Sequence, residues 1–247
     1  MPEVAIQTRD LTKKFGDFTA VNQISFDVRR GEIFGFLGAN GAGKTTAIKM
    51  LTGLLSPTSG EGSVAGHDIH SESEAIKKKI GYMSQRFSLY DDLTVKENIR
   101  FYGGVYGLSR HILRSKYDEI LEKVDLKDEI DSRVGSLPLG WKQKLAFSIA
   151  LLHEPKIVFL DEPTGGVDPI TRRQFWEMIY KASEDGVTVF VTTHYMDEAE
   201  YCDRVSIMVD GKIEALDSPV ELKRSFSAKS IEEVFIELAR GAENSDG

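Results

Sequence analysis

The segment 33-IFGFLGANGAGKTT-46 decides the fold of this chain, because a short apolar run leads into a glycine-rich turn that ends in Lys-Thr-Thr. The apolar, helix-like pattern 47-AIKMLTGLL-55 follows at once. Glycine at positions 38, 41 and 43 lets the backbone curl, so that successive N–H groups point inward at phosphate oxygens. The start of the following helix adds a partial positive charge at the same place. A strand, this turn and a helix in that order predict a phosphate-binding P-loop.

The residues of this turn suggest how a nucleotide is held. Lys44 supplies a full positive charge for the β- and γ-phosphates, and Thr45 supplies a hydroxyl for Mg²⁺. A glycine turn that served only to begin a helix would not need Lys-Thr at this spacing. We therefore expect the phosphates and their Mg²⁺ to be held by Gly38, Asn40, Gly41, Gly43, Lys44, Thr45 and Thr46.

The composition is typical of a soluble globular protein. The chain has 247 residues, 41% of them hydrophobic and 28% charged, which is enough for one large α/β domain or two modest lobes. Its formal net charge of −8 argues against broad nucleic-acid binding. Cys202 is the only cysteine, so an intrachain disulfide is excluded, and we expect a small buried filler. No apolar stretch approaches the roughly 18 residues of a membrane span, so we expect any membrane contact to go through a partner.

Short β-branched or aromatic runs alternate with helical patterns, which predicts an α/β fold. Asp210-Gly211 stands between two apolar runs and predicts an antiparallel hairpin. Strand signals vanish from about Gln85 to His153, and a block of that size predicts an inserted helical lobe. We expect strands near residues 4–7, 24–28, 33–37, 62–66, 80–84, 156–160, 187–192 and 204–210.

The same signals divide the chain into an α/β core, a helical lobe and a C-terminal part, at residues 1–84 with 154–224, 85–153, and 225–247. The C-terminal part begins with an amphipathic helix, 231-IEEVFIELAR-240, which we expect to pack on the body of the protein. We expect the tail from residue 241 to be disordered. Helix starts are predicted at Ser71, Thr94 and Asp168.

Polar side chains follow several of the predicted strands. The strand 157-IVFLDE-162 ends in two carboxylates: Asp161 can hold Mg²⁺ and Glu162 can polarise a water that attacks the γ-phosphate. His194 and Gln85 also follow strands. A polar side chain that leaves the carboxyl end of a strand in an open α/β sheet points at the ligand crevice. Each of the two has a structural alternative, because such residues also serve as ordinary hydrogen-bonding groups.

This set of elements resembles, in order and spacing, the ATP-binding subunits of ABC transporters, over about residues 5–240: the P-loop, Gln85, 137-LPLGWKQ-143, 157-IVFLDE-162, 165-GGVD-168 and His194. The resemblance implies a P-loop NTPase (RecA-like) core with a mixed sheet, an N-terminal antiparallel strand region and an inserted helical lobe. It also implies Mg²⁺-dependent hydrolysis of ATP.

The resemblance implies a role for each matching residue. Glu162 is the general base, His194 the switch histidine and Asp168 a member of the D-loop. Phe15 lies where an aromatic ring stacks on adenine. Lys44 and Gln85 complete the catalytic set, and the residues implied to contact Mg²⁺ are Thr45, Gln85 and Asp161.

The segment Leu137–Trp141 departs from the family signature Leu-Ser-Gly-Gly-Gln, since it reads Leu-Pro-Leu-Gly-Trp. In the family this segment closes over the nucleotide of a facing subunit in a head-to-tail dimer. Pro138 removes the serine hydroxyl, but Pro is tolerated in a first helical turn, so the N–H groups of Leu139 and Gly140 can still face a phosphate. Two outcomes stay open: the backbone still closes the partner's site, or that site binds ATP and hydrolyses it slowly.

The segments 85-QRFSLYDDLTVKENIRFYGGVYGL-108 and 190-FVTTHYMDEAEYCDR-204 most resemble exporters of the ABC-2 type, and among them the second ATP-binding half of tandem proteins. The implied partners are a second ATP-binding half, of the same or a different chain, and transmembrane permease subunits at the cytoplasmic face of the membrane, with no nucleic acid. Phe87 and Tyr90 are candidates for the contact with the membrane subunit. The alternatives are a non-transport ATPase that acts on the ribosome or nucleic acid, and a regulatory ATP-binding half.

Overall fold

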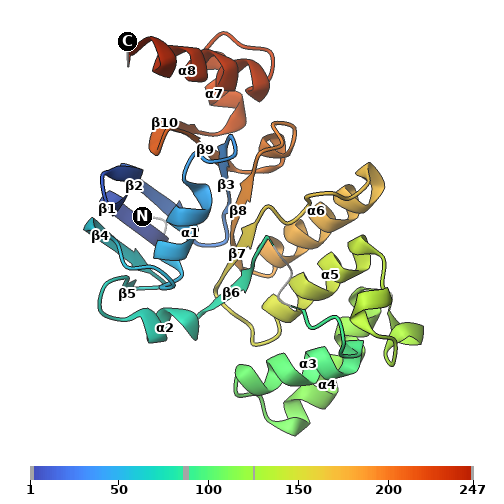
Figure 1. Cartoon of the computed structure of the whole chain (residues 1–247). Coiled ribbons are helices and arrows are strands. Elements are labelled where there is room, and N and C mark those ends of the chain that lie inside the picture. Colours follow the sequence, from blue (N-terminus) through green and yellow to red (C-terminus); the bar gives the residue numbers. More distant parts are fainter. Residues whose placement is uncertain (1–2, 86–88, 125, 246–247) are drawn as a thin grey trace.

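The computed structural model describes residues 3–85, 89–124 and 126–245 and contains two β-sheets (Figure 1). The smaller sheet is antiparallel with strand order β2-β1-β4-β5. Its strands are β1 (Val4–Phe15), β2 (Phe18–Arg29), β4 (Ser59–Val64) and β5 (His67–Asp68). The larger sheet has the order β10-β9-β3-β8-β7-β6 and is parallel from β9 to β6, with β10 antiparallel at its edge. Its strands are β3 (Ile33–Gly38), β6 (Ile80–Met83), β7 (Ile157–Asp161), β8 (Thr188–Thr193), β9 (Arg204–Val209) and β10 (Lys212–Asp217).

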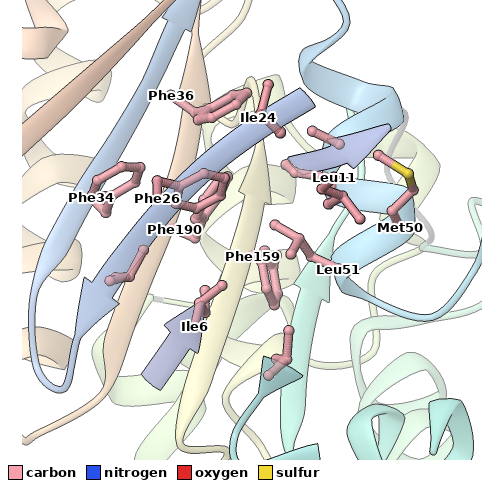
Figure 2. Packing of buried hydrophobic residues seen from close by; sticks show 14 of the residues in the cluster. Ile6, Leu11, Ile24, Phe26, Phe34, Phe36, Met50, Leu51, Phe159 and Phe190 are labelled. Carbon is pink, nitrogen blue, oxygen red and sulfur yellow. The ribbon is translucent and has the colours of Figure 1, made fainter. Parts of the chain in front are cut away.

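An apolar layer joins the two sheets, with helix α1 (Lys44–Leu51) at its side. Figure 2 shows the phenylalanine cluster of this layer, in which Phe26 of β2 faces Phe34, Phe36 and Phe190 of the larger sheet. The rings of Phe26 and Phe34 are stacked with centroids 5.5 Å apart. Alternate residues of β2 point to one face, so a half-apolar strand is enough to cover the fully buried strand β3. The predicted mixed sheet and N-terminal antiparallel region are therefore confirmed.

Helices α5 (Leu139–Ala150) and α6 (Pro169–Glu184) cover the other face of the larger sheet (Figure 1). Phe175 and Trp176 of α6 are almost fully buried there. The predicted start of α6 is confirmed, with Asp168 as the N-cap and proline at the first helical position. Cys202 is buried in the same layer as a free thiol, as expected. Helices α7 (Pro219–Ser225) and α8 (Ile231–Ser245) follow β10.

A third apolar cluster lies in the helical region between β6 and β7, where α3 (Val95–Val105) and α4 (Arg110–Lys123) pack with one face of α5. Thr94 and Glu97 form the predicted capping box at the start of α3. The short 3₁₀ turns η1 (Lys127–Glu129) and η2 (Val134–Ser136) lead into α5. This separate cluster agrees with an inserted lobe, while the exact division into 1–84 with 154–224, 85–153 and 225–247 stays a prediction.

Two predictions about helix ends were wrong. Helix α2 (Ser73–Lys77) begins two residues after the expected cap Ser71, whose hydroxyl instead donates to Asp68 Oδ1 over 2.9 Å. Asp68 therefore engages the Ser71 hydroxyl, which would otherwise have capped the helix. The tail from residue 241 was expected to be disordered, yet α8 includes residues through Ser245. Alanine and glutamate at 242 and 243 favour helix and extend α8 past Gly241.

The amphipathic stripe of α8 packs on the body of the protein, since Ile231 and Val234 are buried in the apolar layer that also contains Phe175 and Trp176 of α6. Residues 246–247 lie outside the described part of the chain. Among the described residues, no helix has both the length and the apolar character that crossing a bilayer would require.

Candidate functional site

The parallel strands bring the predicted site residues to one edge of the larger sheet. Strands β3, β6, β7 and β8 all run in the same direction, so their carboxyl ends meet at that edge. Lys44 follows β3, Gln85 follows β6, Asp161 ends β7 and His194 follows β8. Side chains that lie far apart in the sequence thereby meet at one place, since Lys44, Gln85 and His194 each lie within 3.4 Å of the Glu162 carboxylate that follows β7.

The turn between β3 and α1 needs glycine at three positions for two different reasons. Gly41 and Gly43 have φ angles of +87° and +104°, a region that other residues rarely occupy. A Cβ on Gly43 would also collide with the carbonyl oxygen of Ala20 in β2. A Cβ on Gly38 would lie 2.6 Å from the carbonyl oxygen of Met208. The backbone of the turn is therefore wedged between β2 and β9, which fixes the direction of its N–H groups.

Lys44 is held inside the turn that precedes it. Its side chain is only 4% exposed. Its Nζ donates to the carbonyl oxygens of Gly38 and Ala39 over 2.8 and 3.0 Å, and lies 3.4 Å from Glu162 Oε1. The ammonium group is thus held at the start of α1 by two carbonyl oxygens and one carboxylate.

Asp161 lies next to the first turn of α1. Its Oδ1 accepts hydrogen bonds from Thr192 Oγ1 at 2.8 Å and from Thr45 Oγ1 at 3.3 Å. Burial raises the pKa of this carboxyl above its ordinary value, and the hydrogen bonds from Thr192 and Thr45 partly oppose the rise. Among the described residues the hydrogen-bond partners of this carboxylate are the two threonine hydroxyls, which are uncharged, so the buried carboxylate is suited to a cation.

The donor set fits Mg²⁺. A carboxylate and a hydroxyl converge at Asp161 and Thr45, and Mg²⁺ is commonly bound by one or two protein oxygens together with substrate phosphates and water. Among the described residues, no group of three or more His, Cys, Asp or Glu side chains could hold a metal by itself. Such a site therefore depends on a bound nucleotide for its remaining ligands.

Glu162 connects the other predicted catalytic residues. Its φ angle is +50°, unusual for a residue other than glycine, and it turns the side chain away from the line of β7. Its N–H donates to Thr192, both to the carbonyl oxygen and to Oγ1. Glu162 Oε2 accepts from Gln85 Nε2 over 2.9 Å and lies 3.1 Å from His194 Nδ1. The structure therefore brings Lys44, Gln85, Glu162 and His194 together, while their roles stay predictions.

Phe15 lies at the tip of the β1–β2 hairpin, paired with Phe18 across the turn. Its side chain is 50% exposed and that of Phe18 is 65% exposed, and Lys13 Nζ lies 5.2 Å from the centre of the Phe15 ring. The hairpin is next to the P-loop, because Ala20 of β2 contacts Gly43. An exposed ring so placed is available to stack on a base.

The altered signature begins α5. Pro138 is its N-cap and accepts no N–H through a side chain. Leu139 is 41% exposed and lies over Gly166, and a Cβ on Gly140 would collide with Thr171 of α6. Asp168 caps α6 instead: its Oδ1 accepts from the N–H groups of Ile170 and Thr171, both over 3.0 Å. Leu139, Gly140 and Asp168 thus line one concave surface formed by the starts of two helices.

The sequence interpretation missed several residues of this region. Thr192 binds both Asp161 and Glu162, and Gln143, 1% exposed, donates to the carbonyl oxygen of Gly165 over 3.2 Å. The available signal was the pair Thr192-Thr193 at the end of an otherwise apolar strand, because polar residues on a buried strand need partners.

Comparison with known proteins agrees with this geometry. The family model described as ABC transporter matches residues 21–165. The protein YbhF of Escherichia coli, described as a probable multidrug ABC transporter ATP-binding protein, is 50% identical over 241 residues. That match covers 96% of this chain and 42% of YbhF, so the chain spans about two fifths of the relative's length.

Solved structures give the same result. One described as an ATP-binding subunit of an ABC transporter matches with a TM-score of 0.85 and 29% identity, over 95% of this chain and 99% of that one. The dimeric ATP-binding cassette MJ0796, bound to ADP and phosphate after hydrolysis, matches with a TM-score of 0.78 and 26% identity, over 86% of this chain and 98% of that one. Because the family model covers more than half of the residues, this chain belongs to the ABC transporter family, as one of its ATP-binding cassettes.

Proposed function

We propose that this cassette is the motor of an exporter and that it hydrolyses ATP at the edge formed by Lys44, Asp161, Glu162, Gln85 and His194. The observation that carries the proposal is the position of Glu162, whose carboxylate lies 3.4 Å from Lys44 Nζ, 2.9 Å from Gln85 Nε2 and 3.1 Å from His194 Nδ1. A candidate base that accepts from Gln85 and lies beside Lys44 and His194, next to a P-loop, supports a role in activating the water that attacks the γ-phosphate.

In the proposed reaction the residues of this chain act as follows. Lys44 and the N–H groups of the turn bind the β- and γ-phosphates and stabilise the charge that develops on them. Glu162 accepts a proton from the attacking water, whose oxygen bonds to the γ-phosphorus as the bond to the ADP oxygen breaks. His194 and Gln85 hold the Glu162 carboxylate and contact the γ-phosphate or the attacking water. Phe15 stacks on adenine.

Mg²⁺ would be held by Thr45 and Asp161, with Gln85 as a third candidate, and when bound it would neutralise charge on the phosphates. Thr192 supports this site without contacting the metal, because its hydroxyl donates to Asp161 and its carbonyl and hydroxyl fix Glu162. A single threonine thus holds the carboxylate of Asp161 and the backbone of Glu162.

We further propose that the cassette works in a head-to-tail dimer, in which Leu139, Gly140 and Asp168 face the nucleotide of the partner cassette. The proposal is supported by the concave surface at the starts of α5 and α6 and by the dimeric form of the MJ0796 cassette. A partner cassette with a standard signature would leave the site on Lys44 and Glu162 fully competent, and the altered signature would affect the partner's site alone.

The proposed partner on the membrane side is a transmembrane permease subunit, so the cassette would act peripherally at the cytoplasmic face. Exposed apolar side chains gather on the helical lobe, where Tyr90 and Phe101 pack edge to face with ring centres 4.8 Å apart and are 47% and 43% exposed. Val105 and Ile112 are 63% and 44% exposed nearby on the lobe. Phe87, the other predicted contact, lies outside the described residues. The likeness to the Nod factor export ATP-binding protein I of Burkholderia lata, 37% identical over 236 residues, supports export as the direction of transport.

The decisive experiment measures ATP turnover by the chain together with its partner cassette, for wild type and for Glu162→Gln. We expect the variant to bind ATP with unchanged affinity and to lose hydrolysis by about a hundredfold or more. Glu200→Gln is the matched control, because Glu200 is paired with Lys223 on the surface and should leave turnover unchanged. Equal turnover by wild type and Glu162→Gln would contradict the proposal, and sedimentation with ribosomes in place of permease-containing membranes would support the non-transport alternative.

A further inference from the structure

Glu198 is a buried carboxylate to which none of the proposed roles assigns a function. It begins the 3₁₀ turn η3 (Glu198–Tyr201), a few residues after His194, and is 0% exposed. A carboxylate that is removed from water needs hydrogen bonds and a positive charge to remain ionised at low cost. Glu198 has both, and each of its partners comes from a different segment of the site.

The first partner is Thr193, which immediately precedes His194. Thr193 Oγ1 donates to Glu198 Oε2 over 2.6 Å and accepts from the N–H of Tyr195 over 3.0 Å. A single hydroxyl therefore connects the residues on both sides of His194 to the Glu198 carboxylate. The turn that aims the imidazole at Glu162 is held by this pair of hydrogen bonds.

The second partner is Thr164, two residues after Glu162. Its hydroxyl donates to Glu198 Oε1. The short turn between them is closed by a hydrogen bond from the N–H of Gly165 to the carbonyl oxygen of Glu162 over 3.2 Å. The segments that carry Glu162 and His194, whose side chains lie 3.1 Å apart, are thus attached to the two oxygens of one carboxylate.

The third partner is Arg172 in the first turn of α6, the helix that Asp168 caps. Arg172 Nε lies 3.4 Å from Glu198 Oε1, and its guanidinium lies 4.2 Å above the ring of Tyr195. Asp197 Oδ2 is a weaker, exposed partner at 3.5 Å from Arg172 Nη1. The positive charge that compensates Glu198 therefore comes from the helix whose start faces the partner cassette in the proposed dimer.

We propose that Glu198 is a positioning residue that fixes the distance between Glu162 and His194 and connects this pair to the start of α6. It does not touch nucleotide in this role; it acts through the hydroxyls of Thr164 and Thr193 and the guanidinium of Arg172. The inference rests on the proposed function, because it assigns Glu198 to the hydrolytic step at the same site. A displacement of about 1 Å at a reacting group can cost up to a hundredfold in rate, so small movements of these two segments matter.

The test replaces Glu198 with Gln in the full chain, assembled with its partner cassette. The amide can accept only through one atom, so one of the two threonine hydroxyls loses its acceptor. We expect kcat for ATP hydrolysis to fall by about tenfold or more, with KM and the ATP affinity of the chain within about twofold of wild type. Glu200→Gln, in the same turn but on the surface, is the control and should match wild type in all three values.

A second pair of variants keeps the test decisive if Glu198→Gln folds poorly. Thr193→Val removes the hydroxyl and preserves the branched shape, whereas Thr193→Ser retains the hydroxyl. We expect Thr193→Val to lower kcat as Glu198→Gln does, and Thr193→Ser to restore it to within about threefold of wild type.

The outcomes separate this inference from the proposed function. A wild-type assembly that does not turn over ATP would overturn the proposed function, and this inference with it. Normal wild-type turnover that is unchanged in Glu198→Gln and Thr193→Val would overturn this inference alone. So would a loss of kcat accompanied by an equal loss of ATP affinity and a lower Tm, since that result would mean a purely structural role.

Discussion

Helices α5 and α6 begin side by side, yet their first turns are completed in opposite ways. Asp168 caps α6, accepts from the N–H groups of Ile170 and Thr171, and also accepts from Thr171 Oγ1 over 2.5 Å. Pro138 stands at the same position of α5 and offers no side-chain acceptor. Every α-helix begins with N–H groups that lack intrahelical partners. In α6 a side chain of the same chain accepts from two of these groups, whereas in α5 no capping side chain does.

Besides α5, helix α1 also starts without a side-chain cap, since Gly43 occupies its N-cap position, and so does the five-residue helix α2. In the part of the chain that the structure describes, the other helices of at least seven residues have caps: Thr94 for α3, Ser109 for α4, Asp168 for α6, Ser218 for α7 and Ser230 for α8. Among these longer helices, the two uncapped starts are those assigned to phosphate, α1 to this chain's nucleotide and α5 to the partner's. The comparison suggests that an omitted cap leaves N–H groups and helix dipole available to an anion.

The largest effect is expected at α1, because Lys44 adds a full positive charge to the uncapped start of this helix. Lys44→Met should lower ATP hydrolysis by about a thousandfold and weaken ATP binding, because the side chain would no longer stabilise the phosphates. Lys49→Met, in the last turn of the same helix, is the control. The measurements are ATP turnover and the affinity for ATP. Binding that survives in Lys44→Met would show that the uncapped N–H groups suffice without the lysine.

The next prediction contrasts Asp161, beside the uncapped α1, with the cap Asp168. The pKa of Asp161 is raised by burial, so the unfolded chain releases this proton at lower pH than the native protein does. Native stability is therefore lost as pH rises from 3.8, the ordinary value, through the raised pKa. Asp161→Asn should increase the Tm of the nucleotide-free chain at pH 7 by about 2–4 °C, the equivalent of about 1 kcal/mol in a domain of this size.

The same Asp161→Asn variant should lose hydrolysis by about a hundredfold, because the metal contributes several kcal/mol to such a reaction. Tm measured from pH 3.8 up to about pH 8 is the check on stability. The difference between variant and wild type should grow with pH. A difference that is constant over this range would mean that ionisation of Asp161 is not its cause.

A smaller effect is expected at the capped helix. The pKa of Asp168 is lowered, first by the hydrogen bond from the Thr171 side chain and then by the backbone bond from the same residue. The ionised Asp168 carboxylate stabilises the native protein above pH 3.8, the ordinary pKa of the group, and this stabilisation is lost as the pH falls through the lowered pKa. Asp168→Ala should lower the Tm by a few degrees at pH 7 and by less in acid. Asp185→Ala, at the other end of α6, is the control and should not lower the Tm.

Much of this architecture could be predicted from short-range chemistry. The glycines and lysine of the P-loop, the acids that end β7, the cap and proline of α6 and the hairpin at Asp210-Gly211 are each specified by residues a few positions apart. Parallel strands then bring their ends together, so the main site residues could be named in advance. The exact contacts among Lys44, Glu162 and His194 could not.

Two further features could not be predicted: the start of α2, where two local hydrogen bonds compete, and the burial of Glu198, whose partners lie far away in the sequence. Ser71 has a capping-box spacing, but the nearer acceptor Asp68 takes its hydroxyl. Glu198 lies in the polar stretch that follows His194 and gives no sequence signal of burial, because its partners Thr164, Arg172 and Thr193 meet only in the folded chain. Tertiary contacts of this kind have no local pattern.

The smallest change in stability, and the sharpest test of the comparison, comes from Pro138→Ser. A serine cap would stabilise the start of α5 by roughly 0.5–2 kcal/mol. Loss of proline frees the unfolded chain and costs about 0.4–1 kcal/mol, so the two effects nearly cancel and the Tm should change little. Pro138→Ala, which loses the ring and adds no hydroxyl, should lower the Tm.

The effect of Pro138→Ser on hydrolysis should appear at the partner's nucleotide, because α5 faces that site in the proposed dimer. Turnover is best measured in a dimer in which this chain also carries Glu162→Gln, so that only the partner's site hydrolyses ATP. We expect Pro138→Ser to change turnover there, and to leave this chain's own site unaltered when the partner's base is replaced instead. An equal effect on both sites would contradict the asymmetric arrangement. A partner's site that is unaffected by either Pro138→Ser or Pro138→Ala would mean that the backbone N–H groups of the uncapped helix already close it.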